Sequence, residues 1–68
     1  MKFTKQIFEL LNIQPNEDFK IKESPNCIFR LDNNLNLQGT TKESEGFWIT
    51  QIDGLVRILN GIYTIEKI

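Results

Sequence analysis

The side chains that most often carry out acid–base or metal chemistry are scarce in this sequence. It contains no histidine and one cysteine, Cys27, so neither a Cys/His zinc site nor an internal disulfide bond can form. Carboxylate pairs occur at Glu17–Asp18 and at Glu43 and Glu45, in segments that read as turns or loops without an apolar wall to raise a pKa. We therefore predict that the protein is not an enzyme and that it uses no metal ion or cofactor.

Cys27 is the remaining conventional nucleophile apart from the Ser and Thr hydroxyl groups, and no histidine is present to activate it. It begins a predicted strand in phase with Phe29 and Leu31, which favours the role of a small buried hydrophobic residue. The four glycines are spread along the chain and form neither a phosphate-binding loop nor a dinucleotide-binding motif.

Basic and aromatic side chains on strands can bind single-stranded nucleic acid by contacting phosphates and stacking on bases. The candidates for such contacts are Lys20, Lys22, Phe29, Arg30 and Trp48. The basic surface is sparse, because 8 Lys and Arg residues face 9 Asp and Glu residues and the net charge is −1. Nucleic-acid binding is therefore the alternative interpretation and not the favoured one.

The sequence predicts two helices. The first begins with Thr4 as its N-cap and ends near Asn12, since Pro15 prevents further continuation. The second has Thr50 as its N-cap and ends at residues 60–61. Its apolar stripe has the spacing i, i+3, i+4, i+7 and consists of Ile52, Leu55, Val56 and Leu59.

Alternating apolar and polar residues predict strands between and after the helices. The first three strands, at 19–22, 27–31 and 35–38, are separated by short turns and should form an antiparallel meander. A polar loop at 39–46 precedes a short apolar run at 47–49, and a last strand is predicted at 62–68. The order α-β-β-β-(β)-α-β predicts a single α+β domain over residues 1–68, with an antiparallel sheet of four or five strands and two helices.

Strand phase separates a second set of apolar residues from the predicted core. Successive side chains of a strand point to opposite faces of the sheet. If the residues next to Ile28, Trp48 and Ile62 in each strand face the core, these three point to the reverse side. An exposed apolar set on so small a domain is typical of a protein interface. The competing interpretation, to which we give equal weight, is that one helix covers each face and that these residues belong to the core.

The size of the chain also favours association. A core in a 68-residue domain supplies about 3–5 kcal/mol, and here neither a disulfide bond nor a zinc site adds to it. Oligomerisation is the remaining source of stability, so we expect a homodimer. The unpaired cysteine, the absence of a 20-residue apolar run and the charged N-terminal segment predict a cytoplasmic protein outside the membrane.

Both terminal thirds of the chain resemble a group of known proteins. The segment 7–21, with its Leu-Leu-Asn turn, its proline, its acidic pair and Phe-Lys-Ile, is similar to the start of small proteins from phages and mobile elements of low-GC Gram-positive bacteria. The segment 59–67, with Trp48 upstream, resembles their Leu-Asn-Gly-x-x-x-Ile-x-Lys ending. These families have no established activity, so the resemblance transfers no functional residues and implies only an accessory protein inside a bacterial cell.

The leading prediction from the sequence is a non-catalytic protein-interaction module of phage or mobile-element origin. The resemblance implies that its partner is a host or phage protein, such as a defence or nucleic-acid enzyme, whose activity it modulates. Ile28, Trp48 and Ile62 are the predicted contacts.

Overall fold

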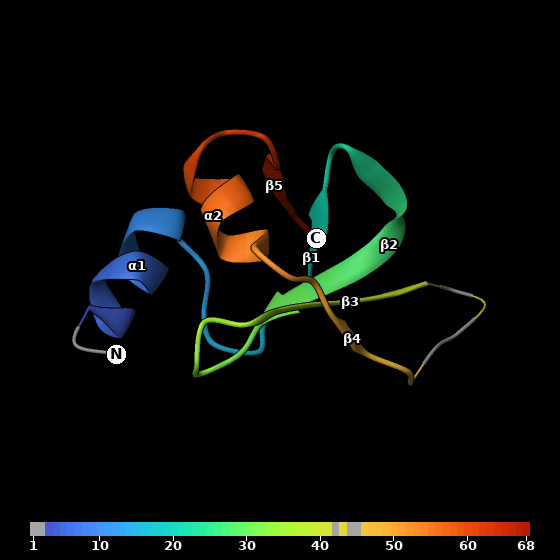
Figure 1. The fold of residues 1–68 in the computed structure, drawn as a ribbon, viewed down its shortest axis with the longest axis horizontal. Coiled ribbons are helices and arrows are strands. Elements are labelled where there is room, and N and C mark those ends of the chain that lie inside the picture. Colours follow the sequence, from blue (N-terminus) through green and yellow to red (C-terminus); the bar gives the residue numbers. More distant parts are fainter. Residues whose placement is uncertain (1–2, 42, 44–45) are drawn as a thin grey trace.

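The computed structural model describes residues 3–41, 43 and 46–68 of the chain (Figure 1). Its elements follow the order α-β-β-β-β-α-β, which confirms the predicted α+β fold with the optional strand present. They are α1 (Thr4–Leu11), β1 (Phe19–Ile21), β2 (Ser24–Leu31), β3 (Leu37–Thr41), β4 (Ile49–Thr50), α2 (Gly54–Leu59) and β5 (Ile65–Lys67). No helix in these described ranges is long and apolar enough to cross a membrane.

The five strands form one sheet in the order β4-β3-β2-β1-β5, and every neighbouring pair is antiparallel. The first three strands make the predicted meander. The chain then adds the short β4 beside β3, crosses the sheet through α2 and returns as β5 at the opposite edge. Both helices lie on the same side of the sheet (Figure 1).

The core fills the space between this helical layer and the sheet. The alternation of the strands turns Phe19, Ile21, Phe29 and Leu31 toward the helices, where Phe8 of α1 and Ile58 of α2 meet them. The rings of Phe19 and Phe29 stack with their centroids 6.4 Å apart. The remaining buried apolar residues are Ile13, Leu35 and Leu37.

The first helix ends as predicted but begins differently. Asn12 adopts a left-handed conformation with φ of 57°, which stops the helix. At the other end, the carbonyl of Phe3 accepts a hydrogen bond from the N–H of Ile7, so Phe3 is the N-cap residue. The prediction of Thr4 as the N-cap was therefore wrong, because Thr4 already lies in the first turn of the helix.

The second helix begins four residues after the predicted cap. The N–H of Gln51 donates to the carbonyl of Leu37 over 2.7 Å, so the segment that includes Thr50 continues the sheet edge instead of capping a helix. The helix starts only at Gly54 and buries Gly54 and Ile58. Of the apolar stripe named from the sequence, only Leu55 packs against the core, while Ile52, Val56 and Leu59 are exposed.

The last strand and the polar loop also differ from their predicted bounds. β5 starts at Ile65, because the N–H groups of Ile62 and Tyr63 both donate to the carbonyl of Arg57 and hold the chain in a bend. β3 extends to Thr41, so residues 39–41 of the predicted loop are strand. Positions 42, 44 and 45 of that loop lie outside the described residues.

Candidate functional site

The side of the sheet opposite the helices carries a groove of about 620 Å³. No described element covers this side (Figure 1). We call this hollow the reverse-face groove. Its lining residues are Asp18, Ile28, Arg30, Thr40, Thr41, Gly46 and Trp48.

Arg30 and Trp48 meet at the centre of the reverse-face groove. Strand β4 pairs Ile49 with Gly39, so the preceding residue, Trp48, turns to the reverse side and reaches across β3 toward β2. The guanidinium carbon of Arg30 lies 3.5 Å from the centre of the Trp48 ring. This is a cation–π contact, which holds both side chains in a defined position.

The guanidinium group of Arg30 is not satisfied by its neighbours. Its Nε atom is buried and makes no hydrogen bond within the described part of the chain. A carboxylate oxygen of Asp18 is 3.9 Å from Nε, which is an ion-pair distance and too long for a hydrogen bond. The groove therefore presents a cation that is stacked on Trp48 and whose Nε–H lacks a hydrogen-bond acceptor among the described residues.

The three predicted interaction residues fall in two places. Ile28 and Trp48 both line the reverse-face groove and are half-buried, together with Arg30. Ile62 is exposed in the bend between α2 and β5 and is not part of a strand, and it does not line the reverse-face groove. The predicted grouping of these three residues on one strand face is thus wrong, because residue 62 precedes β5.

The predicted nucleic-acid contacts are also dispersed. Phe29 is buried in the core, where its ring stacks on Phe19, so it cannot stack on a base. Lys22 is exposed in the turn after β1, and Lys20 is exposed opposite Glu66 of β5. Only Arg30 and Trp48 of the predicted set are in contact with each other.

A second surface lies on α2 and was not predicted as a surface. Ile52, Val56 and Leu59 are 84%, 54% and 47% exposed, and we call these three residues the α2 ridge. Val56 and Leu59 share one side of the helix, while Ile52 lines a shallow hollow together with Val56. The sequence showed these residues as part of a regular apolar stripe. The spacing of such a stripe does not distinguish a helix face that packs against the core from one that is exposed.

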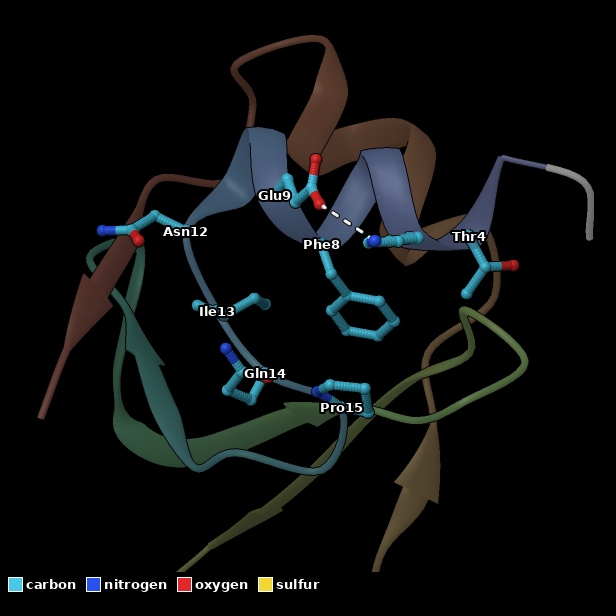
Figure 2. A pocket seen from close by; sticks show the side chains of 8 residues that line it. Thr4, Phe8, Glu9, Asn12, Ile13, Gln14 and Pro15 are labelled. Carbon is cyan, nitrogen blue, oxygen red and sulfur yellow. Dashed lines mark ion pairs between the residues drawn. The ribbon is translucent and has the colours of Figure 1, made fainter.

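A further hollow, of about 810 Å³, lies between α1 and the segment that follows it (Figure 2). Phe8 and Ile13 form its apolar part, and polar side chains stand around them. Its titratable groups are Lys5 and Glu9, which form an exposed ion pair of 4.0 Å on successive turns of α1 (Figure 2). This arrangement contains no desolvated acid, base or nucleophile.

Among the described residues, two carboxylates have a lowered pKa: Asp32, which closes a turn, and Glu23, which accepts hydrogen bonds from Thr64, far along the chain. Burial raises the pKa of Asp32, but hydrogen bonds from the N–H groups of Asn36 and Asn34 and from the amide of Gln38 outweigh it. The N–H of Thr64 lowers the pKa of Glu23 through a bond of 2.7 Å, with a smaller contribution from the Thr64 hydroxyl. These carboxylates are charged acceptors for nearby donors, which is a structural role.

The described residues contain no cluster of three His, Cys, Asp or Glu side chains that could hold a metal ion. Cys27 is half-buried and packs against the core next to Phe29. The two surfaces with a distinctive arrangement are therefore the reverse-face groove and the α2 ridge.

Comparison with known proteins gave no match to a family model, a curated protein or a solved structure. The resemblance of the terminal thirds to small phage and mobile-element proteins accordingly stays a prediction. We therefore base the proposals below on the reverse-face groove and the α2 ridge.

Proposed function

We propose that this protein is a non-catalytic protein-interaction module that forms a homodimer through the α2 ridge. The observation that carries the proposal is the outward position of Ile52, Val56 and Leu59 on and beside one short helix. In keeping with the resemblance of the chain ends, we also propose that the dimer serves a phage or mobile element by binding a host protein.

The exposed apolar side chains of the α2 ridge would stabilise the protein if a second molecule covered them. Burying a large aliphatic side chain completely stabilises a protein by about 1.5–3 kcal/mol relative to leaving it exposed. The α2 ridge has three such side chains, whereas the described part of the chain buries nine apolar residues in its core. Covering the ridge thus adds a contribution comparable to the expected stability of the isolated domain, which is about 3–5 kcal/mol.

A second copy of the same chain is the occupant that best fits this ridge. In a two-fold symmetric dimer the same patch packs against itself, so an apolar ridge meets an apolar ridge without needing a different partner surface. The exposed charges beside the ridge, Asp53 and Arg57, have opposite signs. Antiparallel packing of two α2 helices places Asp53 of one copy toward Arg57 of the other, which favours the pairing electrostatically.

Sedimentation equilibrium tests this proposal with a matched pair of variants. Val56→Lys places a charge in the centre of the ridge and should convert the dimer to a monomer, because burying an unpaired ammonium group is costly. Leu10→Lys makes the same kind of change at an exposed position of α1, outside the ridge, and should leave the dimer intact. Circular dichroism establishes that both variants are folded.

Two results would count against dimerisation through the ridge. One is a wild-type protein that stays monomeric at millimolar concentration. The other is a Val56→Lys variant that dimerises as strongly as the wild type and Leu10→Lys, which would place the interface elsewhere.

A further inference from the structure

The reverse-face groove holds an arginine that is prepared for a ligand. The Arg30 side chain is only 31% exposed, and stacking on Trp48 restrains its guanidinium plane at 3.5 Å. A side chain that is already immobilised loses less conformational entropy when it binds. The planar fork of an arginine also matches the two oxygens of a carboxylate, which a lysine cannot do.

The buried Nε–H donor of Arg30 lacks a hydrogen-bond acceptor among the described residues. It is one of the five N–H donors that an arginine carries. The Asp18 carboxylate lies 3.9 Å from Nε, so it partly offsets the cost of burying the positive charge of Arg30. At this distance it does not accept a hydrogen bond from the Nε–H.

The walls of the groove suit a peptide side chain. Ile28 and the Trp48 ring supply apolar surface beside the cation, and Thr40 and Thr41 lie along the neighbouring strand. Methylene groups of a glutamate could contact the apolar walls while its carboxylate faces Arg30. The volume of about 620 Å³ lies within the range of specific ligand pockets.

We propose that the reverse-face groove binds an acidic segment of a partner protein, with a glutamate or aspartate carboxylate paired to Arg30 above the Trp48 ring. This inference deepens the proposed function, because it states the chemistry of the partner. It rests on the protein-interaction part of that proposal and is independent of dimerisation through the α2 ridge, which lies on the other side of the sheet.

The surroundings favour an acidic peptide over single-stranded nucleic acid. Arg30 occupies the face of Trp48 on which a base would stack, and Phe29 is buried. Arg30 is the one cation among the described lining residues of the groove, and it already stands beside the Asp18 carboxylate, whereas a run of phosphates needs several cations to neutralise it. A single carboxylate needs only the fork of Arg30.

Titration by NMR spectroscopy tests the inference with a blocked oligoglutamate peptide as the probe. We expect saturable shifts of the Arg30 Nε–H and the Trp48 indole N–H signals, with no comparable shifts at α1. Arg30→Lys keeps the charge but loses the fork, and it should weaken binding about tenfold or more. Lys5→Gln removes one positive charge on the helical side and should leave the affinity unchanged.

Three outcomes would overturn the proposed binding of an acidic segment at the reverse-face groove. The inference is overturned if oligoglutamate causes no saturable shift at Arg30, or if Arg30→Lys binds it as well as the wild type. An oligothymidylate of equal charge that binds the groove more tightly would overturn it in favour of nucleic acid. Repeating the titration with Val56→Lys separates the two proposals, because disruption of the α2 ridge should leave peptide binding at Arg30 unaltered.

Discussion

Gly54 lies so close to Leu37 that no larger residue fits at its position. A Cβ atom built on Gly54 would stand 2.5 Å from Leu37 Cδ2 and 2.6 Å from Leu37 Cβ. Because the Leu37 Cβ is fixed to the backbone of β3, the contact cannot be relieved by a rotation of the leucine side chain alone. This close approach sets the distance between α2 and the sheet, and it determines which side of the helix faces inward.

We expect Gly54→Ala to lower the free energy of unfolding by about 1–3 kcal/mol, although alanine is the better helix former. The cause is steric displacement of α2 from β3. Val56→Ala, in the same helix at an exposed position, should change stability by only a few tenths of a kcal/mol when it is measured on dilute protein. Urea denaturation compares the two variants, and a Gly54→Ala protein as stable as the wild type would contradict the packing argument.

The position of Gly54 also explains what the sequence could not predict about α2. Apolar spacing predicted a helix in this region, and a helix is present there. Spacing alone could not identify its buried side, because the glycine that contacts the sheet carries no apolar side chain and so leaves no hydrophobic signal. The strands were more predictable, since alternation in Phe19–Ile21 and in Cys27–Leu31 distinguishes the two faces directly.

The reverse-face groove was only partly predictable for a related reason. Alternation correctly turned Ile28 and Trp48 to the same side of the sheet. The contact between Arg30 and Trp48 depends on the order of the strands, because β3 lies between the strands that carry them. Sequence proximity does not supply that order. Ile62 was misplaced because the bonds to the Arg57 carbonyl delay the start of β5.

Replacement of Asp32 should destabilise the turn between β2 and β3. Asp32→Ala removes the acceptor of three hydrogen bonds, from Asn34, Asn36 and Gln38, and should cost about 1–2 kcal/mol at neutral pH. Glu9→Ala is the control, since Glu9 makes only a weak ion pair on the exposed side of α1. Chemical denaturation of the two variants at pH 7 tests the difference.

The same carboxylate should make stability depend on acidic pH. The pKa of Asp32 is lower in the folded protein than its ordinary value, so the folded state binds fewer protons than the unfolded state in this range. The stabilisation that ionised Asp32 provides is complete above the pKa of the unfolded state, which is about 4. It is lost as the pH falls through the lower pKa of Asp32 in the folded state. Asp32→Ala should therefore differ less from the wild type at low pH. An equal difference at both pH values would contradict this assignment.

Glu23 ties the edge strand β5 to the turn after β1. Its carboxylate accepts the N–H of Thr64 at 2.7 Å, and the carbonyl of Thr64 in turn accepts the N–H of Lys22. Glu23→Gln weakens the charged acceptor, so the amide hydrogens of Thr64 and Lys22 should exchange faster with solvent. Exchange at Phe29, in the middle of the sheet, should stay nearly constant. Equal acceleration at all three amides would indicate global destabilisation instead.

Trp48 is the only tryptophan, so its fluorescence reports on the reverse-face groove directly. Arg30→Ala removes the group that covers one face of its ring at 3.5 Å, and greater contact with water should follow. We expect a shift of the emission to longer wavelength and stronger quenching by acrylamide. Lys20→Ala, on the same side of the sheet but outside the groove, should change neither quantity. If both variants retain the wild-type spectrum and quenching, the stacked pair does not persist in solution, and the groove loses the fixed cation on which its ligand chemistry depends.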